Sequence, residues 1–246
     1  MPRILIPIPT SFDPAYNLRS WPEYAAAIDA EAIQVPLTHT PIELERLLEA
    51  ADGVILPGSG ADVDPARYGH DRDPATAPRD PARETTDFAL IQAAERLHKP
   101  LLAICFGTQS LNVYRGGTLL QDLPPVPVNH AAGRSVLVAH TVLVSHGSRF
   151  GQIVSGPAVA AERTAVDEEF FKIPVNTSHH QAIGTPGEAL RIVCRCTEDG
   201  VIEAVETADP DHWMIGVQWH PERSTHISAS SRALFADFLR TAATHL

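Results

Sequence analysis

Short apolar runs alternate with stretches of helical periodicity through the first half of the chain. The apolar runs predict buried strands at residues 4–8, 32–37, 53–56 and 101–104. The helical stretches lie at residues 21–30, 40–50, 84–97 and 106–114. Thr40 before Pro41 is typical of a helix start, because threonine caps the first turn and proline fits it. This alternation predicts a mostly parallel sheet with helices on both faces.

The second half has a different pattern. Residues 135–144 and 190–206 contain paired β runs, the latter around a turn at residues 198–200 that favours a hairpin. Another apolar strand is predicted at 213–219, followed by a closing helix at 227–242. We therefore expect one α/β domain over residues 1–246, with a smaller antiparallel β extension beside the parallel sheet. The segment 64–83 predicts a long loop, which is often functional.

Composition narrows the classes of function. The 246 residues carry a formal net charge of −11, and no dense Lys/Arg cluster favours nucleic acid. No apolar run approaches the roughly 20 residues that span a bilayer, so we expect no membrane partner. The N-terminal residues lack the pattern of a signal peptide. The three cysteines (Cys105, Cys194 and Cys196) provide no disulfide framework, which predicts a cytoplasmic location.

Cys105 stands where the apolar run 101–104 meets the helical stretch 106–114. This position places the sulfur at a sharp turn between a strand and a helix. The unpaired amides and partial positive charge of a helix start favour thiolate over thiol. The pattern predicts that Cys105 is a nucleophile.

A nucleophilic thiol needs a base, and the base needs a group that orients it. His220 follows directly on the apolar run 213–219, and Pro221 then bends the chain. Glu222 can turn back toward the imidazole. Alone, these three residues would more often be a turn with a solvated carboxylate. Together with Cys105 they predict a catalytic triad of Cys105, His220 and Glu222.

The segments around these residues resemble the class I glutamine amidotransferase superfamily. The resemblance rests on Cys-Phe-Gly-Thr-Gln at 105–109, Trp-His-Pro-Glu at 219–222 and Leu-Pro-Gly-Ser-Gly-Ala-Asp-Val-Asp-Pro at 56–65. Further stretches are similar to the γ-glutamyl-γ-aminobutyrate hydrolase branch, a group like peptidase C26. They lie at residues 62–65, 68–69, 111–123 and 176–182. The resemblance implies a flavodoxin-like sheet.

The resemblance also implies residue roles. Cys105 would attack the γ-carbonyl of a glutamyl group to form a thioester, and His220 would move the proton. The oxyanion would be held by the amide of Phe106 and by an amide of the loop Gly58, Ser59 and Gly60. The residues that match substrate-binding positions are Gln109, Ser178, His180 and Gln181. No cofactor and no metal are implied.

The chain departs from the branch at three positions. Phe106 stands where many members have arginine, Ala103 replaces the glycine of the usual elbow, and Ser59 interrupts a glycine pair. The backbone amide of residue 106 can still serve an oxyanion hole. With these changes the hypothesis of hydrolysis still stands, but the sequence does not predict which amine is the leaving group.

Other polar signals have simpler interpretations. Neighbours such as His179 and His180 point to opposite faces of a strand, and no Cys, Asp or Glu nearby in the sequence completes a metal site. We expect His179 to be a buried, hydrogen-bonded histidine. The segment 62–65 has too few oxygen ligands for Ca²⁺ and favours Asx turns. Cys194 and Cys196 are expected to be small buried hydrophobic residues rather than a redox pair.

The leading hypothesis is hydrolysis of the γ-glutamyl amide bond of a small γ-glutamyl compound. A second hypothesis is a glutaminase subunit that delivers ammonia to a partner synthase. A third is a catalytically silent binding protein of the same fold. The partner in the first case is a small-molecule substrate, and a homodimer is the default expectation for assembly.

Overall fold

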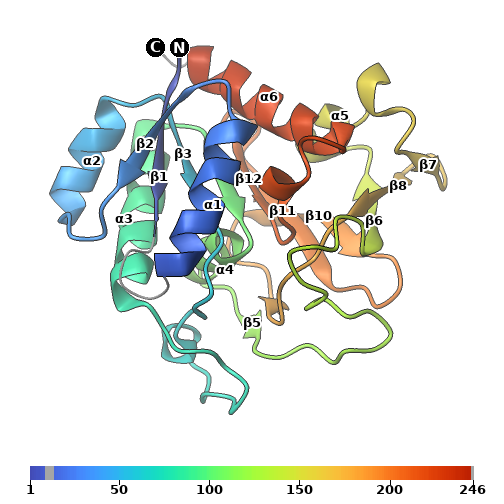
Figure 1. Ribbon diagram of the computed structural model, residues 1–246, viewed down its shortest axis with the longest axis horizontal. Coiled ribbons are helices and arrows are strands. Elements are labelled where there is room, and N and C mark those ends of the chain that lie inside the picture. The colour runs from blue at the N-terminus through green and yellow to red at the C-terminus, as the bar shows by residue number, and fades with distance from the viewer. Residues whose placement is uncertain (9–13, 245–246) are drawn as a thin grey trace.

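One twelve-stranded sheet runs through the part of the chain that the computed structural model describes, residues 1–8 and 14–244 (Figure 1). Its strand order is β2-β1-β3-β4-β12-β11-β10-β6-β8-β7, with β9 beside β11 and β5 beside β9. The parallel part consists of β1 (Arg3–Pro7), β2 (Glu31–Val35), β3 (Gly53–Leu56), β4 (Leu101–Ile104) and β12 (Met214–Val217).

The remaining strands are antiparallel to their neighbours. They are β5 (Leu119–Leu120), β6 (His140–Ser145), β7 (Thr164–Ala165), β8 (Phe170–Val175), β9 (Ala182–Ile183), β10 (Leu190–Cys196) and β11 (Ile202–Thr207). The expected combination of a parallel sheet with an antiparallel extension is confirmed. Three strands of the extension have only two residues each.

The described residues also form six α-helices and three short 3₁₀ helices. The α-helices are α1 (Pro14–Ala27), α2 (Pro41–Glu49), α3 (Pro81–Leu97), α4 (Phe106–Tyr114), α5 (Arg149–Ile153) and α6 (Ala229–Thr244). The 3₁₀ helices are η1 (Pro65–Tyr68), η2 (Pro157–Val159) and η3 (Pro221–Arg223). Among the described residues, no helix is both long and apolar enough to cross a membrane.

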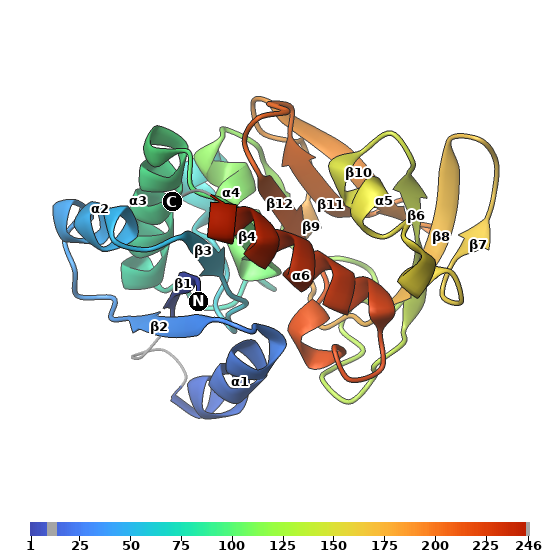
Figure 2. The ribbon, with the colours of Figure 1, turned by 90° about the horizontal axis from the view of Figure 1, so that it is seen from above.

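Helices cover both faces of the parallel strands, as Figure 2 shows. Ile4 of β1 packs in one core with Tyr24 of α1 and Phe238 of α6. Leu5, the next residue, packs on the opposite face with Leu90 of α3. Successive side chains of a strand point to opposite faces, so a strand buried on both sides is apolar throughout. This is why the first-half strands are continuous apolar runs.

The structure corrects several predicted boundaries. Helix α1 begins at Pro14 instead of residue 21 and continues through Pro22. The predicted loop 64–83 contains η1, and its last residues already belong to α3. The predicted elements at 53–56, 101–104 and 106–114 are confirmed without change. The predicted hairpin is confirmed as β10 and β11.

Candidate active site

Cys105 lies at the turn between β4 and α4 and has an unusual backbone conformation. Its φ is 52° and its ψ is −107°, in a region that non-glycine residues rarely occupy. The Cys105 amide donates a 2.8 Å hydrogen bond to the carbonyl of Val217 in β12, which holds the turn in place. Strain of this kind persists only where the surrounding structure enforces it, and it is concentrated at functional sites.

Gly107 permits helix α4 to start directly below this turn. A Cβ atom at this position would lie 2.2 Å from the carbonyl oxygen of Leu56, at the end of β3. Only glycine allows the helix to approach the neighbouring strand so closely. The glycine therefore sets the position of Cys105 above the sheet.

His220 follows β12, the strand that pairs in parallel with β4. In their register Val217 is opposite Ile104, so Cys105 and His220 leave neighbouring strands at the same edge of the sheet. His220 Nδ1 lies 2.7 Å from Glu222 Oε1, and both side chains are buried. The geometry leaves Nε2 as the ring nitrogen that can exchange a proton with another group.

Asn176 holds the backbone of His220, a contact for which the sequence analysis assigned no role. The Asn176 Oδ1 atom accepts a 2.9 Å hydrogen bond from the His220 amide, and its Nδ2 donates a 2.7 Å bond to the His220 carbonyl. Asn176 follows β8 and is far from His220 in the sequence. A pairwise contact of this kind leaves no local pattern, so sequence periodicity could not reveal it.

Burial is the main cause of the shifted pKa values of Cys105 and His220. It raises the pKa of the Cys105 thiol to about 12, with Arg223 opposing the shift and Glu222 reinforcing it. The Phe106 amide at the helix start lowers this pKa, as expected, but desolvation outweighs it. Burial also lowers the pKa of His220, so its ring is neutral and ready to accept a proton.

The loop after β3 supplies one wall of the site. The Gly58 amide donates a 3.0 Å hydrogen bond to the Tyr24 hydroxyl and faces away from the cavity, whereas Ser59 and Gly60 line it. The Ala61 amide donates to Ser59 Oγ at 3.1 Å, which closes the loop on itself. Of the three loop residues expected at an oxyanion hole, only Ser59 and Gly60 therefore border the space beside Cys105.

A buried arginine supports this loop from below. Arg83 donates through its guanidinium to the Pro57 carbonyl and pairs with Asp87 at 2.6 Å. Its guanidinium carbon lies 5.0 Å from the centre of the Phe106 ring, within range of a cation–π interaction. Arg83 thus joins the loop after β3 to the start of α4, although the sequence placed it in a long loop.

A cavity of about 320 Å³ opens in front of Cys105. The predicted residues that line it are Ser59, Gly60, Cys105, Phe106, Gln109, Ser178, His180 and Gln181. His220 and Glu222 lie buried outside this lining. The cavity therefore brings together the predicted nucleophile and all four predicted substrate-binding residues.

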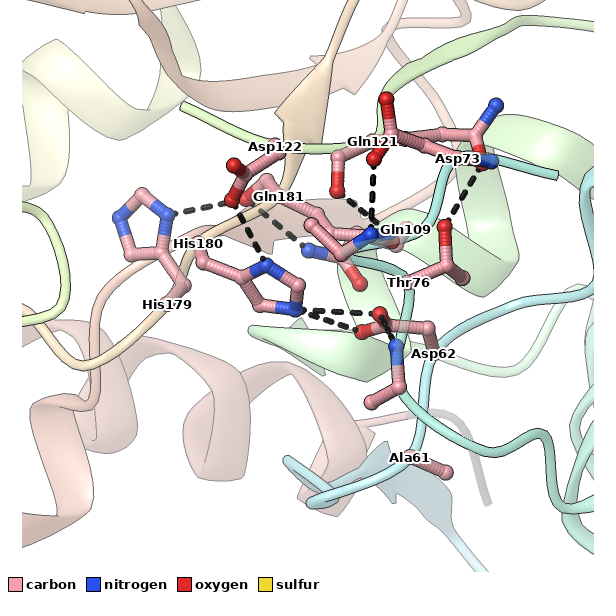
Figure 3. Close-up of polar contacts among 12 residues, drawn as sticks. Ala61, Asp62, Asp73, Thr76, Gln109, Gln121, Asp122, His179, His180 and Gln181 are labelled. Atoms are coloured by element: carbon pink, nitrogen blue, oxygen red, sulfur yellow. Dashed lines mark hydrogen bonds and ion pairs between the residues drawn. The ribbon is translucent and has the colours of Figure 1, made fainter. Parts of the chain in front are cut away.

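His180 is held between two carboxylates at the cavity wall (Figure 3). Its Nε2 lies 3.0 Å from Asp62 Oδ2, and its Nδ1 lies 3.2 Å from Asp122 Oδ1. Hydrogen bonding to Asp62 is the main cause that raises the pKa of His180 to about 9. The ring is therefore a cation at neutral pH. The sequence predicts only a turn at Asp62, and the Asx turn of this segment is made by Asp64.

Two glutamines complete the polar wall. Gln109 Nε2 donates to the carbonyl of Gln181 at 3.2 Å and lies 3.3 Å from Gln218 Oε1. Gln181 Nε2 donates to the carbonyl of Gln121 at 2.9 Å. Figure 3 shows Gln109, Gln121 and Gln181 meeting beside His180. These bonds link α4 to the segment that carries His180.

This arrangement is that of the class I glutamine amidotransferases: a parallel sheet, a cysteine at the turn after a central strand, and a histidine–glutamate pair after the next strand. The glutaminase domain of Trypanosoma brucei CTPS, solved with bound acivicin, has the same fold. It superposes with a TM-score of 0.62 at 16% identity, covering 99% of this chain and 94% of that one.

The Peptidase C26 family model matches residues 12–222, and the chain belongs to that family. The γ-glutamyl-γ-aminobutyrate hydrolase PuuD of Escherichia coli (strain K12) is 34% identical over 226 residues, which is 90% of this chain and 85% of the relative. A candidate glutamine amidotransferase of Mycobacterium tuberculosis is 36% identical over 200 residues. That match covers 79% of this chain and 59% of the relative, so the relative has additional sequence.

Proposed function

We propose that this chain hydrolyses the γ-glutamyl amide bond of a small γ-glutamyl compound, such as γ-glutamyl-γ-aminobutyrate or a γ-glutamyl amine. One observation carries the proposal: the strained, buried Cys105 faces a cavity while the His220–Glu222 pair leaves the adjacent strand. The name of the Escherichia coli relative supports the same acyl group. No cofactor is required for this chemistry.

In the first half of the reaction, His220 Nε2 takes the proton of the Cys105 thiol as the sulfur attacks the γ-carbonyl carbon. Since the pKa of Cys105 is about 12, the proton moves during the attack, and no thiolate is present before substrate binds. Glu222 accepts a hydrogen bond from His220 Nδ1 and stabilises the imidazolium. His220 then gives the proton to the departing amine, the C–N bond breaks, and a thioester remains.

In the second half, water attacks the thioester carbonyl. His220 accepts a proton from the water, the C–S bond breaks, and the proton returns to the Cys105 sulfur. Glutamate leaves with its new carboxyl group. The same imidazole therefore serves as base and acid in turn.

Charge that develops on the carbonyl oxygen would be stabilised by backbone amides. We assign this role to the Phe106 amide at the start of α4 and to an amide of Ser59 or Gly60. The Gly58 amide is left out of the assignment, because it is bonded to the Tyr24 hydroxyl. The contact of Arg83 with the Pro57 carbonyl would keep the loop fixed in advance of the reaction.

The cavity wall suits the amino-acid end of a glutamyl group. His180 is a cation at neutral pH and would attract the α-carboxylate, while Asp62 and Asp122 keep the ring oriented. Ser178 and Gln181 line the same wall and would bind the α-amino and α-carboxylate groups with His180. Gln109 would contact the glutamyl chain from α4.

Replacing the nucleophile tests this proposal. Cys105→Ala should lower kcat/KM on γ-glutamyl amines by at least about 10³-fold, because it removes the thiol that forms the acyl intermediate. Cys196→Ala removes a buried thiol outside the cavity and should stay within about threefold of the unmodified protein. Full activity of Cys105→Ala would show that the assignment is wrong.

The segment after η1 favours hydrolysis by the free-standing chain over a glutaminase subunit. The Ala77 amide donates to Asp62 at 2.6 Å, and Thr76 Oγ1 and the Asp73 amide each lie 2.8 Å from Gln121 Oε1. The segment therefore holds Asp62, a residue of the cavity wall, in place through contacts within this chain. The isolated chain should hydrolyse γ-glutamyl amines faster than glutamine, as measured by kcat/KM. Negligible turnover of every γ-glutamyl amide would favour the glutaminase subunit or the silent binding protein.

A further inference from the structure

Three histidines and one glutamate converge on a point behind the cavity, and the proposed reaction uses none of them. The distances to Glu203 Oε1 are 3.2 Å from His130 Nδ1, 3.4 Å from His140 Nε2 and 3.7 Å from His179 Nε2. All four residues are at least nine-tenths buried. They come from the loop before β6, from β6, from the segment after β8 and from β11.

The converging atoms have no hydrogen-bond partner among the described residues. His130 Nδ1, His140 Nε2, His179 Nε2 and both carboxylate oxygens of Glu203 are all buried and unpaired. The nitrogen–oxygen distances suit ion pairs, but the directions do not suit hydrogen bonds. Buried polar atoms without partners are unfavourable, so a cluster of five around one point needs an explanation.

The second ring nitrogens of two histidines show which atoms carry lone pairs. His140 Nδ1 lies 3.3 Å from the carbonyl of Thr141, and His179 Nδ1 lies 2.9 Å from the carbonyl of Gln181. A carbonyl only accepts, so each Nδ1 carries the proton. Both Nε2 atoms then face the Glu203 carboxylate, an arrangement that a cation between the nitrogens and the oxygens would stabilise.

The third histidine is held by a carboxylate. His130 Nε2 lies 2.9 Å from Asp199 Oδ2, which leaves His130 Nδ1 to face Glu203. Histidines that bind metals characteristically donate their other ring N–H to a carboxylate or a backbone carbonyl. All three histidines of the cluster have such an outer partner.

We infer that His130, His179 and Glu203 bind a divalent metal ion of the zinc class, with His140 beside them. Ligand atoms about 2.0–2.2 Å from a tetrahedral zinc ion lie about 3.3–3.6 Å from one another, close to the separations around Glu203 Oε1. The ligand atoms of His130, His179 and Glu203 all lie within 4.8 Å of one another, and His140 approaches from the side of Glu203. Imidazole and carboxylate ligands suit this metal.

Cys196 offers a competing position for the ion. It forms a possible ligand group with His130 and Asp199, and another with His140 and Glu198. The Cys196 thiol already donates a 3.3 Å hydrogen bond to Glu198 Oε2. Both Glu203 carboxylate oxygens, by contrast, are buried and have no hydrogen-bond partner among the described residues. The ion is therefore assigned to Glu203.

The proposed ion would fasten the antiparallel half of the sheet to the cavity wall. His179 lines the cavity and directly precedes His180, while Glu203 lies in β11 of the sheet. The expectation of no metal rested on the absence of acidic residues near His179 in the sequence. Glu203 lies only 3.7 Å away in space, although 24 positions separate it from His179 in the chain.

Metal analysis of the full chain, purified without a histidine tag, tests this inference. We expect about one equivalent of zinc per chain after zinc loading and dialysis, a lower Tm after chelation, and recovery of Tm when zinc returns. Substitution with Co²⁺ should give the visible absorption of a four-coordinate ion without a sulfur charge-transfer band. A chain that keeps no zinc and shows no change of Tm with zinc would overturn the inference.

Two variants locate the ion. Glu203→Gln keeps the shape of the side chain but loses the anionic ligand, and it should lose metal retention by at least about tenfold. Cys196→Ser should retain metal like the unmodified chain. Loss of metal in Cys196→Ser would contradict the assignment, as would a sulfur charge-transfer band in the cobalt form. The cobalt spectrum of the unmodified chain shows whether a sulfur ligand is present even if Glu203→Gln does not fold.

Discussion

Cys105 combines a strained backbone with a thiol that burial keeps protonated. Its φ of 52° holds the side chain above the sheet, and its raised pKa prevents a permanent thiolate. A neutral His220 beside it can take the proton only when attack on a substrate makes the transfer favourable. Under the proposed mechanism, the cysteine is therefore unreactive at rest and becomes a nucleophile when substrate is bound.

The charge of His180 leads to a pH prediction at the residue scale. Its pKa is about 9 in the folded chain and near 6.5 in an ordinary histidine, so folding takes up a proton between these values. The stabilising contribution is fully present below about pH 6.5 and is lost as the pH rises through about 9. The decline of Tm between pH 6.5 and 9.5 should be smaller in His180→Gln than in the unmodified chain. Equal declines would contradict this interpretation.

Site residues that directly follow apolar strands could be predicted from the sequence. Residues whose role depends on a contact with a residue far away in the chain could not. Cys105 and His220 each come directly after a buried run, so their place at one edge of a parallel sheet could be inferred. Asn176, Asp62 and Glu203 act through residues 44, 118 and 24 or more positions away. No single-sequence pattern encodes such contacts.

At the scale of elements, the start of α4 depends on Gly107. Gly107→Ala would place a methyl group 2.2 Å from the Leu56 carbonyl oxygen, which backbone atoms cannot avoid without moving. We expect a loss of about 3 kcal/mol or more in the free energy of unfolding, measured with urea. Gly156→Ala is the matched control, because a Cβ there meets nothing within 4 Å and its φ is −60°. Similar stability of the two variants would contradict the close contact of α4 with β3.

Two hydrogen bonds from the side chain of Asn176 join the end of β8 to His220, just before η3. Asn176→Ala leaves the amide and carbonyl of His220 buried without their partner, which should reduce the free energy of unfolding by about 1–3 kcal/mol. Because the imidazole then loses its position, kcat should fall more than KM rises. The exposed Asn129→Ala serves as the control and should change stability by less than about 0.5 kcal/mol. A rise in KM alone would show that Asn176 acts on substrate binding instead.

Strands that are uniformly apolar were predictable from the sequence, whereas strands interrupted by proline or only two residues long were not. The strands at 53–56 and 101–104 are buried on both faces and stand out in the sequence. Strand β8 contains Pro174, which disguises it, and β5 and β9 are too short to show any period. The sequence predicts a start of α1 at residue 21 instead of Pro14, since a proline such as Pro22 suits the first turn of a helix but here lies inside one.

At the scale of the whole molecule, residues from both halves of the sheet line the cavity. The parallel half provides Cys105 and the His220–Glu222 pair, whereas the segment between β8 and β9 of the antiparallel half provides His180 and Gln181. In the proposed function, the reaction and the recognition of the glutamyl group thus come from different parts of one sheet. A change in the antiparallel half is expected to alter substrate choice more than the reaction itself.

The central claim is that a γ-glutamyl group becomes attached to Cys105 during turnover. Mass spectrometry of acid-quenched reactions tests it directly, with a γ-glutamyl amine as substrate. We predict that the peptide containing Cys105 gains the mass of one glutamyl acyl group, and that no such adduct forms in Cys105→Ala. Steady turnover with no adduct on Cys105, or turnover that persists in Cys105→Ala, would contradict the account.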